Sequence, residues 1–420
     1  MRNKVLPLII ALTLVTSLVV VGCAAPAPAP APTPASAPAP SPPPAPAPTP
    51  PTETQYVTIG ISTPLTGWAA AWGIEHLRAG ELLFAQVNKA GGLDVGGEPH
   101  LIKWIVYDDK FDSTEAQIIA NRLIHEDKVD IFALEDGPPA TAARDISREA
   151  GMLQYATDYT IDQPSAEYPL VFGTMIKTPE IVVTVHKWME AVHPEIKTMA
   201  VLTVNLPYGI DQANLTESHG PEYGINITSV DFFEPWGTID FTAILLKIMD
   251  NNPDAINMVG TGPDVAAIIV KQARELGYDG LLMHTTGPNL EVMKDIAGAE
   301  AMEGFVGGFE YGEPFIDAVQ IFKNDYLVQY KPPFVPQAIL HYASWQALLQ
   351  GIELAGSFES EALANALRSG TFNTVLGNLH FGGEEWYGIG NQLLYPVSLA
   401  TVHDGKIMHL AAPDPVYPTK

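Results

Sequence analysis

The stretch that decides the fold is KTMAVLTVNLPYGIDQANLTESHGPEYGINITSVDFF, from Lys197 to Phe233. It begins with a run of apolar and β-branched residues, continues with a helical pattern from about residue 208, and ends with a second run rich in branched and aromatic residues. Two parallel strands need a long crossover connection, which is usually a helix. The stretch therefore predicts a strand, a helix and a parallel strand, the unit of an α/β fold.

The same alternation extends on both sides of this unit. One series of strands and helices runs from about residue 55 to residue 156, and a second runs from about residue 177 to residue 298. Such series are typical of mainly parallel sheets that helices cover on both faces, so two series predict two α/β lobes. Further helices are expected within residues 316–368, and the end of the chain predicts a hairpin that turns at Asp404-Gly405.

The amino terminus has a different character. Met1–Lys4 is basic, and Leu6–Val21 is nearly all apolar. This layout predicts a signal peptide over residues 1–22, because an apolar run of about 16 residues is short for a membrane-spanning helix, which needs about 20. The sequence Val20-Val21-Gly22-Cys23 resembles the bacterial lipobox, and this resemblance implies that Cys23, the chain's one cysteine, receives lipid.

Residues 23–53 form an alanine- and proline-rich linker. The linker has no apolar periodicity and so cannot build a core, whereas proline favours the extended polyproline II conformation. About 29 residues in this conformation reach on the order of 90 Å. We expect a spacer between a membrane surface and a folded body that begins near residue 54.

Composition and motifs exclude several classes of function. The chain has 22 Lys+Arg and 48 Asp+Glu, and this excess of negative charge repels nucleic-acid backbones. The sequence has no G-x-S-x-G elbow, P-loop or H-E-x-x-H motif, and GTGPDV has Val265 where a dinucleotide fingerprint has its third glycine. We expect no catalytic residues, no cofactor and no metal, and we interpret His284 and His341 as isolated structural histidines.

Several segments together resemble the leucine/isoleucine/valine-binding family of solute-binding proteins, which serve ABC importers. The resemblance extends over about residues 55 to 410 and rests on the order and spacing of the segments rather than on any one of them. The segments are IGISTPLTG, NKAGGLDVGG, YDDKFDSTEA, PYG, Asp240-Phe241, KQARELG, EGFVGG and YASWQALLQGIELAG.

The resemblance implies the periplasmic-binding-protein type 1 fold, an α/β fold whose two lobes are joined by three hinge crossovers and close on a ligand. We expect the crossovers near residues 174–178, 307–311 and 370–375. The expected lobes are residues 54–175 plus 309–372 and residues 176–308 plus 373–415. Ligands of open α/β sheets bind outside the carboxyl ends of the strands, so the loops after the strands should carry the site.

In the first lobe, the resemblance places an aromatic wall for the ligand at Trp72, with Trp68 nearby. Gly137 stands where the family has a serine that binds the ligand carboxylate, although its backbone N–H at a helix amino terminus could still donate to an anion. Asp136 and Glu135 would repel a carboxylate unless they point away. Farther along, Asp158, Tyr159 and Thr160 match the second anchoring turn, and Thr160 keeps the family's hydroxyl.

In the second lobe, Tyr208 matches a tyrosine that closes over the ligand. Thr261 matches a position that is often aromatic, and Thr286 falls where the family has the acid that binds an ammonium group. An ammonium group without a paired carboxylate is costly to bury. Unless Asp136 or Asp158 substitutes for the missing acid, a plain α-amino acid should bind poorly.

Two ligand classes remain open at this point. The aromatic and acidic residues fit a cationic or amide-bearing ligand, through cation–π contacts and charge pairing. Gly137 and Thr160 equally permit an aromatic or short carboxylic acid. We expect a monomeric, extracytoplasmic protein that is anchored by lipid and delivers a small-molecule ligand to an ABC permease; the alternative is a ligand-binding receptor subunit for a membrane sensor.

Overall fold

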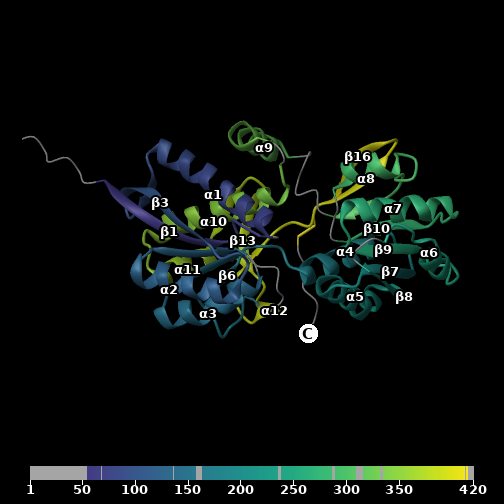
Figure 1. The fold of residues 1–420 in the computed structure, drawn as a ribbon, viewed down its shortest axis with the longest axis horizontal. Helices are drawn as coiled ribbons and strands as arrows, with labels where there is room; N and C mark the ends of the chain where they lie inside the picture. Colours follow the sequence, from purple (N-terminus) through teal and green to yellow (C-terminus); the bar gives the residue numbers. More distant parts are fainter. Residues whose placement is uncertain are drawn as a thin grey trace, which may run out of the picture. The chain divides into compact units, whose positions relative to one another are not determined.

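The structure is a computed structural model that describes residues 54–67, 69–135, 137–157, 163–234, 238–285, 289–308, 316–331, 334–411 and 413–414. Its strands form two sheets, which confirms the predicted α/β class. Most neighbouring strands are parallel, and the helices between them act as crossovers. Figure 1 shows each sheet together with its helices. No helix of the described residues is both long and apolar enough to span a bilayer.

The first sheet has nine strands in the order β12-β13-β14-β6-β5-β4-β1-β3-β2. Its strands are β1 (Gln55–Thr63), β2 (Leu93–Val95), β3 (Glu98–Asp108), β4 (Ile131–Glu135), β5 (Gln154–Thr157), β6 (Val171–Gly173), β12 (Thr371–Thr374), β13 (Gly377–Gly382) and β14 (Gln392–Leu394). The associated helices are α1 (Ala70–Ala90), α2 (Ser113–Asn121), which continues as a π-helical turn over Arg122–Glu126, α3 (Gly137–Ala150), α9 (Asp317–Tyr330), α10 (Gln337–Ala355), α11 (Ser360–Ser369) and α12 (Glu384–Tyr387).

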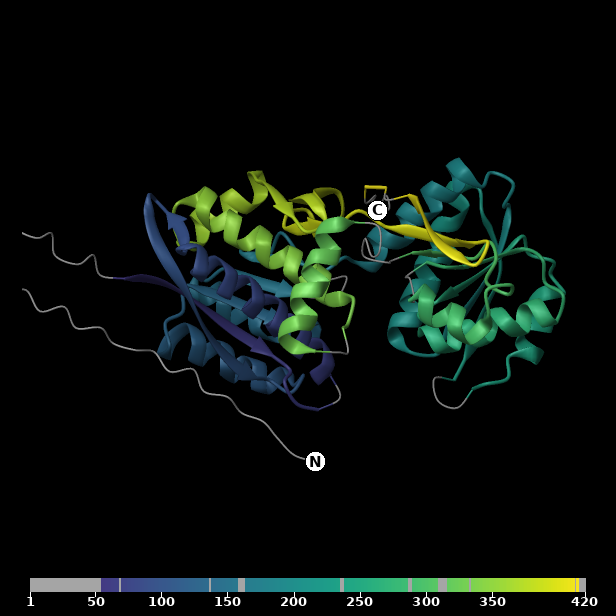
Figure 2. The same cartoon turned by 90° about the horizontal axis from the view of Figure 1, so that it is seen from above.

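Helices cover both faces of this sheet because its central strands are buried on both sides. Ile59, Ile61 and Ala133 belong to the core on the face of α1 and α10, which lie side by side in Figure 2. Phe132 and Leu134 alternate with them and belong to the core on the face of α2 and α3. A strand buried on both faces is a continuous apolar run, and this is why the first four residues of β4, Ile131–Leu134, do not alternate between apolar and polar.

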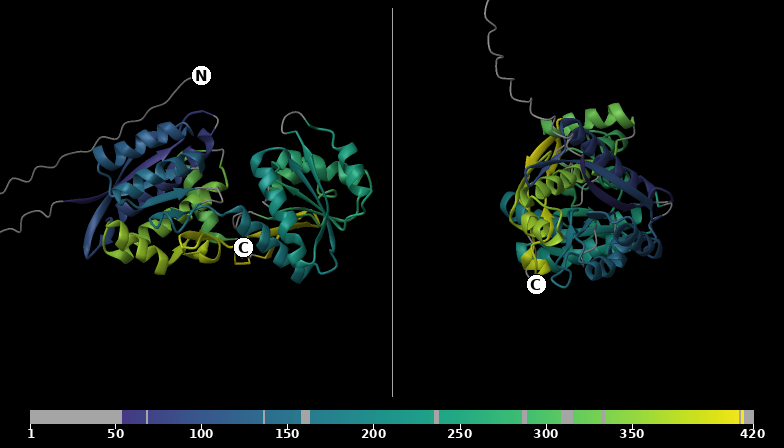
Figure 3. Two further views of the ribbon diagram at one scale, coloured as in Figure 1. Left: turned by 90° about the horizontal axis from the view of Figure 1, so that it is seen from below. Right: turned by 90° about the vertical axis from the view of Figure 1, so that its left-hand side faces the viewer.

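The second sheet has seven strands in the order β16-β15-β11-β10-β9-β7-β8. Its strands are β7 (Thr198–Val204), β8 (Asn226–Phe233), β9 (Ala255–Val259), β10 (Leu281–His284), β11 (Val306–Gly308), β15 (Leu399–His403) and β16 (Lys406–Ala411). The associated helices are α4 (Thr178–Val192), α5 (Pro207–His219), α6 (Thr242–Met249), α7 (Pro263–Glu275) and α8 (Leu290–Ala297), with a 3-10 turn over Gly220–Tyr223. Figure 3 shows helices on both faces of this sheet as well.

The hairpin predicted at the end of the chain is confirmed. β15 and β16 pair antiparallel, and Asp404 and Gly405 occupy the turn with φ of 49° and 71°. Two positive φ values in succession are what a two-residue type I′ turn requires, and Asp-Gly adopts them at low cost.

One expectation about the lobes is wrong. Residues 373–394 were placed in the second lobe, but β13 pairs with β12 and β14 pairs with β13 and β6, all in the first sheet. The chain therefore passes to the second sheet between Leu394 and Leu399 rather than near residues 370–375. Short strands in a glycine-rich stretch carry no signal for the sheet they will join. The other bounds of the lobes stay predictions.

Candidate functional site

The carboxyl ends of β1, β3, β4 and β5 meet at one edge of the first sheet because these strands are parallel. Trp72 lies at this edge, in the first turn of α1 rather than in the preceding loop, and its side chain is 39% exposed. Asp108, at the end of β3, fixes the loop before α1. Its Oδ1 accepts from the backbone N of Leu65 at 2.8 Å, and its Oδ2 accepts from Oγ1 of Thr66 at 2.5 Å.

Gly73 allows α1 to begin close to the end of β1. A Cβ atom at this position would lie 2.1 Å from the carbonyl oxygen of Pro64 and 2.7 Å from Oγ1 of Thr63. The same Thr63 Oγ1 donates to the carbonyl oxygen of Gly73 at 3.3 Å. The contact between helix and strand thus depends on the absence of a side chain, and it positions the adjacent Trp72.

Gly73→Ala should therefore destabilise the protein by about 1–3 kcal/mol, the usual cost of overpacking. It should also displace Trp72, because the helix must move away from Pro64. Chemical denaturation measures the first effect, and the emission maximum of tryptophan fluorescence reports the second. Gly91→Ala is the control, since a Cβ atom there would contact no other atom and would only be strained by the positive φ of 117°. If both variants shift the emission maximum equally, close packing at Gly73 is not what positions Trp72.

Glu135, the last residue of β4, is buried beneath α1 and α10. Its carboxylate lies 3.6 Å from Nδ1 of His76 and 3.8 Å from Nε2 of His341. Burial lowers the pKa of His76 well below its ordinary value and lowers the pKa of His341 to about 3. The Glu135 side chain thus points into a buried cluster rather than toward solvent.

His341 is buried, in agreement with its predicted structural role, but it is not a single histidine, because it contacts His76. The ring centroids of His341 and His76 are 5.2 Å apart, and His76 also stacks on Trp345 at 5.0 Å. This cluster of His76, Glu135, His341 and Trp345 joins α1, β4 and α10 under the site. In the sequence, the only sign of this cluster is a glutamate at the end of an apolar strand.

Gly137 is the first residue of α3 and is buried. It follows β4 directly, so it lies at the carboxyl edge that also carries Trp72. The other predicted residues of the first lobe lie outside the described residues, so their roles in binding stay predictions. These residues are Trp68, Asp136, Asp158, Tyr159 and Thr160.

The carboxyl edge of the second sheet carries Tyr208 and Thr261. Tyr208 lies in the first turn of α5 after β7 and is 53% exposed. Thr261, which follows β9, is largely buried, and its carbonyl oxygen and Oγ1 lie 3.0 and 2.9 Å from Nε2 of His284. Nε2 of His284 is therefore within hydrogen-bond distance of two oxygen atoms of Thr261, and His284 is a structural residue that holds this loop. Thr286 and Cys23 lie outside the described residues.

Asn257, within β9, is tied to Thr285, the residue directly after β10. Asn257 donates from Nδ2 to Oγ1 of Thr285 at 2.5 Å and accepts from the Thr285 backbone N at 3.1 Å. Both residues are fully buried. The second edge thus presents an exposed aromatic ring on α5, and buried hydrogen bonds connect β9 to the first residue after β10.

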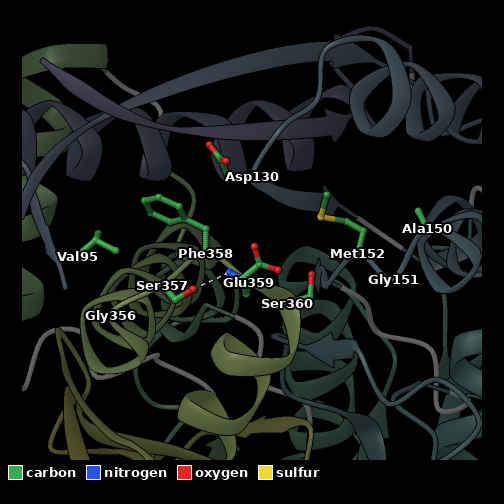
Figure 4. A pocket seen from close by; sticks show the side chains of 10 residues that line it. All are labelled: Val95, Asp130, Ala150, Gly151, Met152, Gly356, Ser357, Phe358, Glu359 and Ser360. Carbon is green, nitrogen blue, oxygen red and sulfur yellow. Dashed lines mark hydrogen bonds between the residues drawn. The ribbon is translucent and has the colours of Figure 1, made fainter. Parts of the chain in front are cut away.

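A hollow of about 510 Å³ lies at the other end of the first sheet. Figure 4 shows its lining, which includes Asp130, just before β4, and Met152, just before β5. The lining residues are Val95, Asp130, Ala150, Gly151, Met152, Gly356, Ser357, Phe358, Glu359 and Ser360. Because it opens at the amino ends of the strands, this hollow is not where an α/β sheet binds its ligand.

Comparison with known proteins decides the family. The model of the periplasmic binding protein family matches residues 56–406. The chain belongs to the periplasmic binding protein family. A curated relative, the leucine-, isoleucine-, valine-, threonine- and alanine-binding protein of Pseudomonas aeruginosa, is 28% identical over 334 residues, which cover 77% of this chain and 85% of the relative.

Solved structures of periplasmic binding proteins confirm the type 1 fold. The substrate-binding protein of the branched-chain amino acid transporter of Streptococcus pneumoniae, in complex with isoleucine, is 21% identical with a TM-score of 0.64 and covers 87% of this chain and 100% of that chain. A solute-binding protein of an ABC transporter from R. palustris, in complex with benzoate, is 19% identical with a TM-score of 0.64 and covers 86% and 98%. The predicted resemblance to the leucine/isoleucine/valine-binding proteins is thus confirmed.

A periplasmic binding protein acts outside the cytoplasm on small solutes, and the related proteins are binding proteins rather than enzymes. The family membership thus supports the predicted location and the predicted class of function. The lipid anchor at Cys23, the signal peptide and the monomeric state stay predictions from the sequence.

Proposed function

We propose that this protein captures a small organic acid at the carboxyl edges of its two sheets and delivers it to an ABC permease in the membrane. The observation that carries the proposal is the family match over residues 56–406, together with Trp72 and Tyr208 at the two edges where such sheets bind ligands. Closure of the lobes would bring both edges to the ligand, and the permease would recognise the closed state.

The geometry of Glu135 favours a carboxylate over an ammonium or amide ligand. Glu135 is 1% exposed and turned toward His76 and His341, so it is not available to anchor an ammonium group of a ligand. Gly137 at the first turn of α3 supplies a helix amino terminus, which attracts anions. Aromatic acids fit these features, as in the solved relative in complex with benzoate; an apolar amino acid, such as the isoleucine of the other relative, would also need Asp136 or Asp158 to pair with its ammonium group.

A thermal-shift assay decides the ligand class. Residues 54–420 are tested against benzoate, L-isoleucine, L-phenylalanine, benzamide and phenethylamine. A ligand at a hundred times its Kd should add roughly 2.7 kcal/mol to the free energy of unfolding. We expect benzoate to raise the melting temperature most, the two amino acids to raise it less or not at all, and the amide and amine to have no effect. If only the amide or amine raises it, the carboxylate class is wrong; if no solute of a wider panel does, the capture function is wrong.

Trp72→Ala should weaken binding of the best ligand by about tenfold or more, because removing an aromatic anchor from a binding site commonly costs more than about 1 kcal/mol. Isothermal titration calorimetry measures the change. Val328→Ala is a matched control, since Val328 is 85% exposed on α9 and its truncation should leave the affinity unchanged. Unchanged affinity in Trp72→Ala would remove Trp72 from the site.

A further inference from the structure

The loop between β3 and α2 has a backbone that ordinary residues avoid. Lys110 and Phe111, in succession, have φ of 56° and 62°. Neither is glycine, and a left-handed conformation at a bulky residue such as phenylalanine is uncommon because Cβ approaches the following carbonyl oxygen. Such strain costs on the order of 1–3 kcal/mol per residue and persists only where the surroundings enforce it, often at functional sites.

Two aspartates enforce this conformation. Asp108 accepts from the backbone N of Lys110 at 3.0 Å, and Asp109 accepts from the backbone N of Phe111 at 2.9 Å. Asp109 is fully buried, and its second oxygen accepts from Oγ of Ser62 at 2.8 Å, which ties the loop to the end of β1. On the far side, Asp112 caps α2 by accepting from the backbone N of Thr114 and Glu115. The loop is therefore held at both ends and in the middle.

The consequence of this conformation is the place of the Phe111 ring. Its centroid lies 6.4 Å from the centroid of the Trp72 ring, and the two planes meet at 57°. Such a distance and tilt lie within the range of attractive aromatic contacts. Phe111 is only partly buried, and Trp72 is 39% exposed, so both rings keep accessible surface at the carboxyl edge of the first sheet. We call Trp72 and Phe111 together the aromatic corner.

We propose that Phe111 is a specificity-determining residue, and that the aromatic corner makes this protein select acids with a flat aromatic ring over acids with an aliphatic group of similar size. This inference rests on the proposed function and narrows its substrate class. Two tilted rings can offer a face to one side of a flat ring and an edge to the other, and both arrangements are attractive for aromatic partners. A puckered aliphatic ring gains contact area but neither of these interactions.

The test compares benzoate with cyclohexanecarboxylate, which has the same carboxylate and a ring of similar size that is not flat. Calorimetry on the full chain should give tighter binding of benzoate. Phe111→Leu should reduce that preference by roughly two- to tenfold, the worth of one aromatic contact. Phe111→Tyr keeps the ring and should keep the preference. Lys110→Gly relieves the neighbouring strain without touching either ring, and it should also leave the preference unchanged.

The remaining outcomes separate this inference from the proposed function. If Phe111→Leu weakens both probes equally, Phe111 only positions Trp72 and the inference is wrong. If the wild-type chain prefers cyclohexanecarboxylate to benzoate, the inference fails but the capture of acids stands. The same conclusion follows if the chain binds L-isoleucine but neither of these two probes. If no acid binds at all, both are wrong. Melting temperatures of the three variants within a few degrees of wild type would show that each is folded.

Discussion

Lowering the pH from 7 to 4 should remove on the order of 5 kcal/mol from the free energy of unfolding, which is comparable to the whole stability of many domains. The cause is a set of fully buried histidines. Burial lowers the pKa of His186 and His284 to about 4 and that of His341 to about 3, from an ordinary value of 6.5. It also lowers the pKa of His76 well below 6.5.

The direction follows from where each state binds protons. Between about pH 6.5 and pH 4 the unfolded chain protonates these histidines while the folded chain does not, so the stability that they contribute above pH 6.5 is lost as the pH falls. The pKa of His186 and of His284 lies about 2.5 units below 6.5 and that of His341 about 3.5 units below it, so each histidine loses roughly 3 kcal/mol of its contribution by pH 4. Asp109 acts in the opposite sense, because burial raises its pKa to about 6 and its protonation favours the folded state. The histidines outnumber it, so the net effect of acid is destabilising.

Chemical denaturation at pH 7, 5.5 and 4 measures this dependence, and His186→Leu provides the matched control. His186 lies in α4, is fully buried, and neither of its ring nitrogens has a hydrogen-bond partner among the described residues. His186→Leu should therefore keep the stability at pH 7 and remove about 3 kcal/mol of the loss at pH 4. An unchanged pH dependence in this variant would mean that His186 is protonated at its ordinary pKa in the folded protein.

Trp345→Ala should destabilise the protein by about 3–5 kcal/mol, the usual cost of removing a large aromatic side chain from a core. Trp345 lies in α10 and is fully buried. It stacks on His76 at 5.0 Å, meets Phe84 edge to face at 5.1 Å, and donates from Nε1 to the carbonyl oxygen of His76 at 3.3 Å. The indole thus fastens α10 to α1 and supports the cluster beneath the candidate site.

The urea midpoint measures this loss, and Leu354→Ala is the control from the same helix. Leu354 is 59% exposed, so its truncation should change the stability by no more than about 0.5 kcal/mol. Trp345→Ala should also weaken ligand binding, because His76 is one turn along α1 from Trp72. Equal midpoints for the two variants would show that α1 and α10 are held together without the indole.

Local patterns along the chain were sufficient for most of the fold. The unit from Lys197 to Phe233 forms β7, α5 and β8 as expected, because a parallel pair needs a helical crossover whatever surrounds it. Asp112 caps α2, and Asp404-Gly405 turns the last hairpin, because caps and tight turns depend on a few adjacent residues. The sheet that β13 and β14 join was not predictable, since it depends on partners distant in the sequence.

The residues of the candidate site likewise divide into those whose positions the sequence could predict and those whose positions it could not. The positions of Trp72, Gly137, Tyr208 and Thr261 after consecutive strands follow from the order of the elements alone, because parallel strands end at one edge. The direction of Glu135 and the pairing of His76 with His341 do not, since they depend on how α1 and α10 pack over β4. The roles of these residues in binding stay predictions.

The sequence by itself determined the α/β alternation, the resemblance to solute-binding proteins and the edge at which we predict ligand binding, because each depends on local periodicity or on segment order. Only the tertiary structure decided that Phe111 meets Trp72. Thirty-eight residues lie between them in the chain, and their contact depends on a left-handed turn that Asp108 and Asp109 enforce from the end of β3. Side chains impose this conformation on a backbone that would otherwise disfavour it, and such an effect produces no periodic pattern in the sequence.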